Sequence, residues 1–439
     1  MKNPIVVLDN GASTIKVGVV TRGGEGKEPR VVQNAIIRSK GDKATYVGHE
    51  FKACSDFASL HYRLPFEKGY VVDWDAQKAV WDGIFSDQVL NLNTTEASLL
   101  ITEPYFNLPN IQEVYDQFIF EEYEFQSYYR CPPASIISYG SLFSHSSLSP
   151  PECMIVVDSG FSFTHVVPIM EGKVIWEALL TNQLKELVSF RQWNMMDETY
   201  IMNHVKESCC LVSPDFKHDL EVCRVDPKHN PIIREYVLPD LTKNKRGHIR
   251  HPDDIVMDND QVLVMNNETF TVPEIIFRPD DIGLDQAGLP ATIAHCISLL
   301  PADVQGMFWA NIGLIGGNTK FPGFKQRLYD FAELRTMAPV DSEVVIYEAD
   351  DPITEAYKSA YNFASKPEFT QHVVTRAEYA ESGSNASRRK FPDWRKSQQA
   401  EKEKGAGKQL EDDRPQPSSG KPPKARSKPV AGSSSMRRR

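Results

Sequence analysis

Two short turns carry the residues of this chain best suited to bind a phosphate group. Asp9–Thr14 (DNGAST) follows the apolar run Ile5–Leu8, and Asp158–Ser162 (DSGFS) follows the apolar run Ile155–Val157. A second apolar run comes after each turn, so each stretch predicts a β-hairpin. Exposed backbone N–H groups in such a turn suit a phosphate, and the Asp carboxylate suits a hydrated Mg²⁺. A plain polar hairpin turn is the alternative for either stretch alone.

The recurrence of the pattern favours a shared site over two unrelated turns. Lys16 lies in the strand that returns from the first turn and adds a cation that can reach a phosphate. We therefore expect the two turns to close on the phosphates of one nucleotide. Asp9 and Asp158 are the candidate metal residues, each holding Mg²⁺ through water. This arrangement resembles the actin, sugar-kinase and heat-shock ATPase superfamily, in which each of two domains contributes such a hairpin.

Further motifs resemble actin and its relatives, and they run in order from residue 5 to about 383. The matching stretches are GYVVDWD at 69–75 (GIVTNWDD in actin), TEPYFNLP at 102–109 (TEAPLNP), FTVPEIIFRP at 270–279 (FRCPEALFQP), LIGGNTKFPG at 314–323 (SGGTTMYPG) and EYAESG at 378–383 (EYDESG). Other strings resemble the actin-related protein 6 class more than actin itself: DNGA at 9–12, DSGFSFTH at 158–165, TNQLKELVSFRQ at 181–192 and MDET at 196–199.

The resemblance implies an α/β, actin-like two-lobed fold of duplicated ribonuclease H-like domains with a nucleotide cleft. Residues 1–150 would form the first lobe, with C-terminal helices from about 345–380 packing back on it. Residues 151–344 would form the second lobe, with an insertion at about 240–260 that departs from actin. Residues 384–439 are rich in Ser, Gly, Pro, Lys and Arg and predict a disordered basic tail.

The resemblance also implies ATP or ADP with Mg²⁺ as a structural cofactor, and a set of residues that contact it. These are Asp9, Asn10, Gly11, Ala12, Ser13, Lys16, Asp158, Ser159, Gly160, Phe161, Ser162, His165, Lys206, Glu207, Gly316, Gly317, Asn318 and Phe321. Paired glycines let a backbone approach a flat base closely. A Lys–Glu pair on a helix is otherwise a solvated face, and only the resemblance assigns Lys206 and Glu207 to the nucleotide.

The sequence predicts that hydrolysis is poor or absent, and we assign no catalytic residue. Actin-type hydrolysis uses a Gln to orient the attacking water, yet no Gln lies between Gln126 and Gln183, and the matching position falls near Ile137. Positioning is most of phosphoryl-transfer catalysis. His165 matches the second water-orienting residue. The alternatives are a slow ATPase or kinase of the same fold, or a filament-forming actin.

Composition and charge limit the classes of protein that this chain can be. No apolar run approaches the roughly 18–20 residues needed to cross a bilayer. The seven Cys include no CxxC pair, which argues against a disulfide framework. Residues 388–439 hold 16 Lys and Arg against 6 Asp and Glu, a net of +10, which leaves −20 for residues 1–387. An acidic body attracts basic partners such as histones, or simply aids solubility.

The resemblance implies a nuclear subunit of SWR-type chromatin remodellers, with a cytoplasmic pool. The implied partners are a Swi/Snf-type ATPase, a hexamer of AAA+ helicase-like proteins, a small zinc-finger subunit, and histones or the nucleosome. Basic patches at 388–390 and 421–426 suit nuclear import or unspecific DNA contact. The insertion at 240–260 is either a partner contact or a solvated loop. Residues 38–45 are short and polar where actin grips its neighbour, which argues against a filament.

Overall fold

Two mixed β-sheets with the same connectivity form the centre of the two lobes. The computed structural model describes residues 3–21, 26–57, 60–144, 151–176, 180–182, 199–239, 247–251, 254, 261–329 and 333–392. All of these lie within one compact unit, Met1–Trp394. The predicted tail beyond residue 392 lies outside the described residues, as do Thr181–Gln192 beyond Asn182 and most of the insertion.

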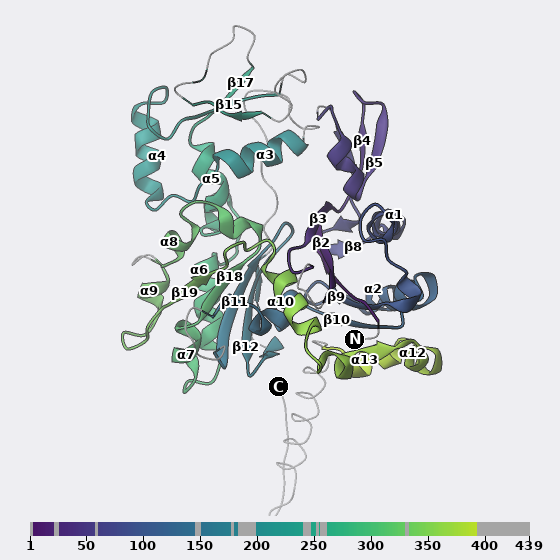
Figure 1. The fold of residues 1–439 in the computed structure, drawn as a ribbon. Helices are drawn as coiled ribbons and strands as arrows, with labels where there is room; N and C mark the ends of the chain where they lie inside the picture. Colours follow the sequence, from purple (N-terminus) through teal and green to yellow (C-terminus); the bar gives the residue numbers. More distant parts are fainter. Residues whose placement is uncertain are drawn as a thin grey trace, which may run out of the picture. The chain divides into compact units, whose positions relative to one another are not determined.

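The first sheet has the order β20-β10-β9-β1-β2-β3 (Figure 1). Its strands are β1 (Ile5–Asn10), β2 (Thr14–Val20), β3 (Arg30–Gln33), β9 (Ser98–Thr102), β10 (Ser127–Cys131) and β20 (Val374–Thr375). β1 pairs antiparallel with β2 and parallel with β9. Every residue of β1 is buried, as expected for an apolar strand covered on both faces.

The second sheet repeats this pattern in the order β13-β12-β11-β18-β19, with β14 also on β12. Its strands are β11 (Cys153–Ser159), β12 (Thr164–Met170), β13 (Lys173–Val174), β14 (Leu180–Asn182), β18 (Ile312–Ile315) and β19 (Ile346–Glu348). β11 pairs antiparallel with β12 and parallel with β18. Both predicted hairpins are therefore confirmed, and the repeated topology confirms the duplicated α/β fold.

Smaller sheets and the helices complete the two lobes. The small sheets are β5-β4-β6 (Ala44–Val47, Ile36–Ser39, Leu60–Arg63), β16-β15-β17 (His248–Ile249, Arg234–Val237, Val262–Met265) and β7-β8 (Phe66–Glu67, Tyr70–Val71). The helices are α1 (Trp74–Phe85), α2 (Pro109–Gln117), α3 (Thr199–Cys209), α4 (Phe216–Val225), α5 (Glu268–Glu274), α6 (Leu289–Ser298), α7 (Gln305–Trp309), α8 (Phe324–Tyr329), α9 (Leu334–Met337), α10 (Glu355–Ala364), α11 (Phe369–His372), α12 (Arg376–Ser382) and α13 (Asn385–Lys390). Short 3₁₀ or π turns are η1 (Gly48–Ala53), η2 (Thr94–Glu96), η3 (Phe118–Glu122), η4 (Pro133–Tyr139), η6 (Pro279–Ile282) and η7 (Gly317–Lys320).

The C-terminal helices return to the first sheet. Figure 1 shows α10 between the two sheets, where it contacts β1, β2 and η4. Tyr357 and Phe363 of α10 are buried in the core of the first lobe together with residues of β1 and β9. The chain therefore crosses between the lobes at two places, η4 and the segment before α10.

The predicted start of the tail at residue 384 is wrong. Residues 385–390 form α13, and Phe391 behind it is 2% exposed. The guanidinium carbon of Arg130 lies 5.4 Å from the centre of the Phe391 ring. Arg388 pairs with Glu113, and Lys390 pairs with Glu378 at 2.7 Å, so this basic patch is part of the folded body. The buried Phe391 ring and these ion pairs hold the chain to the folded body past the change in composition.

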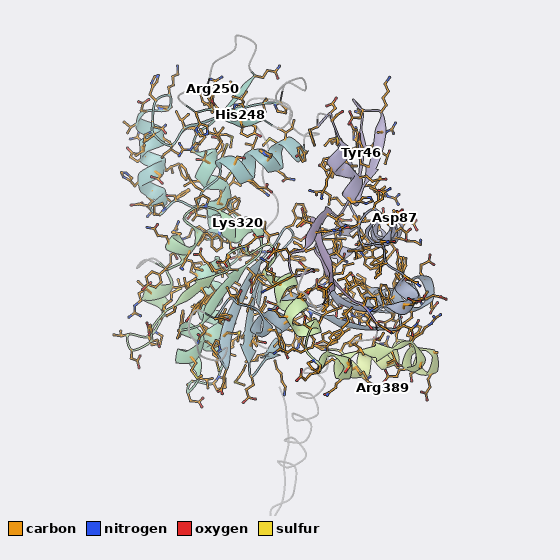
Figure 2. All side chains as sticks on the ribbon, in the orientation of Figure 1. Tyr46, Asp87, His248, Arg250, Lys320 and Arg389 are labelled. Carbon is orange, nitrogen blue, oxygen red and sulfur yellow. The ribbon has the colours of Figure 1, made fainter. Side chains whose placement is uncertain are left out.

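Two predicted surface features are partly described. The polar segment at 38–45 is a tight hairpin, in which the Asp42 carboxylate accepts hydrogen bonds from the Tyr46 hydroxyl (2.8 Å) and the Ser55 N–H (2.9 Å). Figure 2 shows Tyr46 on this hairpin, and His248 and Arg250 beside β15 and β17. In the described part of the insertion, His248 Nε2 lies 3.7 Å from Asp254 Oδ2. Among the described residues no three His, Cys, Asp or Glu side chains are grouped to hold a metal ion.

The structure also describes the state of the cysteines and the length and hydropathy of the helices. All seven cysteines are free and buried. In the described ranges, none of the helices combines the length and the hydropathy that a bilayer span requires.

Candidate functional site

The turn between β1 and β2 is organised by Asp9 and by polar side chains around it. Asp9 and Lys16 are cross-strand partners, and Lys16 Nζ lies 3.5 Å from the Asp9 carboxylate. The Thr102 hydroxyl donates to Asp9 Oδ1 at 2.7 Å. A Cβ at Gly11 would lie only 2.6 Å from the Thr14 carbonyl oxygen, so the turn requires glycine there. Ala12 and Ser13 are half-buried beside it.

Asn10, at the end of β1, has its side chain in the core of the first lobe. Its Nδ2 donates to the Tyr115 hydroxyl at 3.0 Å, and its Oδ1 accepts from Trp81 Nε1 at 3.3 Å. The residue is 5% exposed. The Asn10 side chain therefore fixes the end of β1, and a nucleotide contact by this residue stays a prediction.

The turn between β11 and β12 is held by the loop that follows β18. Asn318 Nδ2 donates to the Gly160 carbonyl at 2.8 Å and to Ser159 Oγ at 3.3 Å. Gly316 has φ +92°, and a Cβ there would lie 2.3 Å from the Ser159 carbonyl oxygen. The structure thus brings together Ser159, Gly160, Gly316 and Asn318 as predicted. Phe161 at the turn is exposed.

The two turns approach each other closely enough for Asp9 and Asp158 to interact electrostatically. Burial raises the pKa of Asp158 to about 6; the hydrogen bond from Tyr105 opposes this rise, the negative charge of Asp9 adds to it, and Lys16 also opposes it. Two carboxylates, one ammonium group and glycine-containing turns are the donor set expected around a Mg²⁺–polyphosphate. A divalent cation would relieve the repulsion between the two carboxylates, so the residues fit the implied cofactor.

The residues assigned to the base lie on the second lobe. Lys206 is half-buried and Glu207 exposed on α3. A hydrogen bond joins the segment after α3 to the loop that contains Phe321: the Val212 N–H donates to the Pro322 carbonyl at 2.8 Å. Gly317 begins η7 in the same loop, between Gly316 and Asn318.

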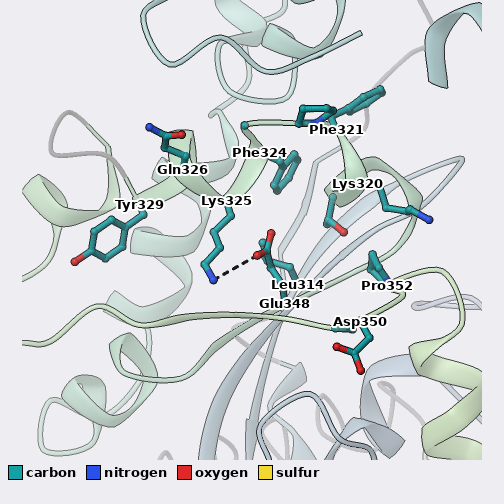
Figure 3. Close-up of a pocket in the computed structure, with 14 residues that line it drawn as sticks. Leu314, Lys320, Phe321, Phe324, Lys325, Gln326, Tyr329, Glu348, Asp350 and Pro352 are labelled. Atoms are coloured by element: carbon teal, nitrogen blue, oxygen red, sulfur yellow. Dashed lines mark ion pairs between the residues drawn. The ribbon is translucent and has the colours of Figure 1, made fainter. Parts of the chain in front are cut away.

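A hollow of about 640 Å³ adjoins this loop but lies apart from the phosphate-side residues. It is lined by residues that include Phe321, Phe324, Tyr329 and the Lys325–Glu348 ion pair of 3.3 Å (Figure 3). Neither Asp9 nor Asp158 lines it, so we do not assign this hollow to the phosphates.

Comparison with known proteins agrees with this geometry. Residues 1–187 and 184–392 match the actin family. An actin-like protein ARP6 of Cryptococcus neoformans var. neoformans serotype D (strain B-3501A) is 48% identical over 418 residues, which cover 88% of this chain and 84% of that protein. The chain belongs to the actin family. Its similarity to actin-related protein 6 of Drosophila melanogaster (37% identity, 87% and 98% covered) and of Arabidopsis thaliana (35%, 88% and 99%) places it in the actin-related protein 6 class.

In this actin-family chain Ile137 and His165, the positions that the sequence resemblance assigns to the water-orienting residues of actin, are both buried. Ile137 on η4 is 1% exposed and packs in an apolar cluster with Ala134 and Val156. Burial lowers the pKa of His165 to about 3, so its imidazole is neutral at neutral pH. The Ile137 side chain has no polar atom with which to hold a water molecule in line.

Sequence reasoning missed Thr102, Tyr105 and Asn34. Asn34 holds the first turn through its N–H to the Ser13 carbonyl and its Nδ2 to the Gly11 carbonyl, both at 2.9 Å. The only available signal for Tyr105 was that TEPYFNLP has Tyr where the actin motif TEAPLNP has Pro.

Proposed function

We propose that this chain is a non-catalytic architectural subunit of a nuclear chromatin-remodelling complex of the SWR type, which exchanges a histone variant into nucleosomes. Its nucleotide site would hold ATP or ADP with Mg²⁺ as a structural ligand and hydrolyse it poorly or not at all. The observation that carries the proposal is the combination of the Asp9–Lys16–Asp158 cluster with a buried, apolar Ile137. This cluster supplies donors that suit Mg²⁺–phosphate, and an apolar side chain lies at the position that the resemblance assigns to the water-orienting Gln.

A bound nucleotide would stabilise the protein by linking the two lobes. The first lobe supplies Asp9 and Lys16, and the second supplies Asp158 and the turn after it. A ligand that binds only the folded state adds about 2.7 kcal/mol of stability at a hundred times its Kd. When bound, Mg²⁺ would neutralise phosphate charge, and this chain's residues would orient the phosphates and join the lobes.

The proposed partners are the subunits that the class resemblance implies: a Swi/Snf-type ATPase, AAA+ helicase-like proteins, a small zinc-finger subunit and histones. The net charge of −20 over residues 1–387 supports an encounter with basic partners. The tail has a net positive charge and suits unspecific, salt-sensitive DNA contact. The proposed location is the nucleus, with a cytoplasmic pool.

The proposal that the site binds a nucleotide is tested with the full chain purified in the presence of Mg²⁺. We expect Mg-ATP to raise the Tm of the wild type and not that of Asp9→Lys, whereas Asp87→Asn, an exposed residue on the first lobe (Figure 2), should respond like the wild type. Single-turnover assays should show no phosphate release at an actin-like rate. An unchanged wild-type Tm, or rapid release, would contradict the proposal.

The proposal that the chain is a subunit of a remodelling complex is tested by affinity purification of the tagged full chain from nuclei. We expect a Swi/Snf-type ATPase and AAA+ proteins in stoichiometric amounts, and histone exchange by the complex that is lost without this chain. Recovery of the chain as a free monomer or as a filament would contradict the assignment.

A further inference from the structure

Tyr105 joins three segments of the chain beside the phosphate-side cluster. It lies between β9 and α2 and is 3% exposed. Its hydroxyl donates to Asp158 Oδ2 at 3.0 Å and accepts from the Ala134 N–H of η4 at 3.0 Å. With one hydrogen bond to β11 and one to η4, the phenol ring is held in one position.

The ring of Tyr105 lies directly on His165. The two ring centroids are 4.3 Å apart, and the Phe163 ring approaches the same imidazole with a centroid distance of 5.4 Å. Rings in contact at such distances leave no space for a water molecule between them. Tyr105 and Ile137 also share one apolar cluster, whereas an ordered water needs two to four polar partners.

We infer that Tyr105 excludes the attacking water from the position beside His165 and so adapts the site to hold a phosphoanhydride intact. The part of this inference that concerns hydrolysis rests on the proposed function, because it requires a nucleotide in the site. In hydrolysis the water oxygen bonds to the terminal phosphorus, the bridging P–O bond breaks, and the water loses a proton. The Tyr105 ring occupies the place from which His165 would orient that water, and it acts there as a positioning residue.

The first test needs no nucleotide, so its failure is distinct from failure of nucleotide binding. The described groups around His165 include Tyr105, Phe163 and Asp158, which is the cross-strand partner of His165. We expect high-resolution crystal structures of the wild type and of Tyr105→Phe, which keeps the ring, to show no ordered water between residue 105 and the His165 ring. Tyr105→Leu should admit an ordered water there, because it removes the ring whose centroid lies 4.3 Å from that of the imidazole. An ordered water at this place in the wild type, or none in Tyr105→Leu, would overturn the inference.

The second test restores a water-orienting side chain. In an Ile137→Gln background, adding Tyr105→Leu should speed single-turnover phosphate release at least about tenfold, which is below the roughly hundredfold that a positioned acid–base group contributes at the low end. Adding Tyr329→Leu, on an exposed residue of α8, is the matched control and should leave the rate unchanged. Equal rates with and without Tyr105→Leu, including no release in either, would contradict the inference.

Discussion

Replacing Tyr200 with alanine should loosen the contact between α3 of the second lobe and the small sheet β5-β4-β6 of the first. The Tyr200 ring stacks on Phe57, with centroids 4.8 Å apart and planes inclined by 18°, and meets the Phe51 ring edge-on at 5.5 Å. Phe51 and Phe57 are 7% and 4% exposed. We call these three rings the aromatic clasp. Its contacts join the two lobes at side chains other than the Tyr105–Asp158 pair.

The size of the effect follows from the two ring pairs. Each aromatic pair contributes about 0.5–1.5 kcal/mol beyond the area it buries, so the loss of both is about 1–3 kcal/mol. That free energy corresponds to a roughly 5- to 150-fold increase in the population in which the clasp is open. The global free energy of unfolding should fall by a similar amount at most, because Tyr200 is only half-buried.

Amide hydrogen exchange with mass spectrometry measures this opening directly. In Tyr200→Ala, exchange should accelerate in β4, β5 and α3, whereas Tyr200→Phe, which keeps both ring contacts, should match the wild type. Tyr329→Ala removes an exposed Tyr, 46% accessible, and is the control for loss of a ring elsewhere. If the proposed nucleotide binds, its release should also be faster in Tyr200→Ala. Exchange within twofold of the wild type in those three elements would refute the reasoning.

Three further changes test other parts of the structure. Arg327→Met should lower the free energy of unfolding in urea by about 3–5 kcal/mol, because it leaves the buried Glu274 and Glu333 carboxylates without the guanidinium that contacts them at 2.9 and 3.1 Å. Burial raises the pKa of Asp158 from 3.8 to about 6. The folded state therefore binds this proton more tightly than the unfolded state, and the stability of the protein should fall as the pH rises from about 4 through about 6. In Asp158→Asn, thermal melts in the presence of a chelator should not show this fall. Phe391→Ala should cost about 3–5 kcal/mol, because the ring is almost fully buried.

These measurements share one control and have separate contradicting outcomes. Val340→Ala, at a side chain that is 94% exposed, should change neither the urea midpoint nor the Tm. An Arg327→Met protein as stable as the wild type would show that the carboxylates find other partners. A pH profile that is the same for Asp158→Asn and the wild type would place the titration elsewhere. A stable Phe391→Ala protein would mean that α13 is not required by the folded body.

Local spacing in the sequence predicted both hairpin turns, and the family resemblance predicted the fold class. An apolar run, an Asp–Gly turn and a second apolar run specify a strand pair within about fifteen residues of chain, and no distant contact is needed to recognise it. The buried side of α1 includes Val80, Trp81, Ile84 and Phe85, whose helical spacing can be seen in the sequence, because residues at that spacing share one face. The family resemblance rests on these same local motifs.

Only the tertiary structure decided which way individual side chains point and which distant residues they meet. Asn10 turns into the core because its amide is bonded to Tyr115, 105 residues away, and Tyr105 reaches Asp158, 53 residues away. Such partners have no spacing rule in the sequence, since their meeting depends on how two sheets and their connecting segments pack. For the same reason the sequence placed Phe391 in a polar tail, whereas in the structure its ring packs against Tyr128 and Tyr129. The sequence determined the turns that can hold a phosphate, and the packing of the two lobes determined what surrounds them.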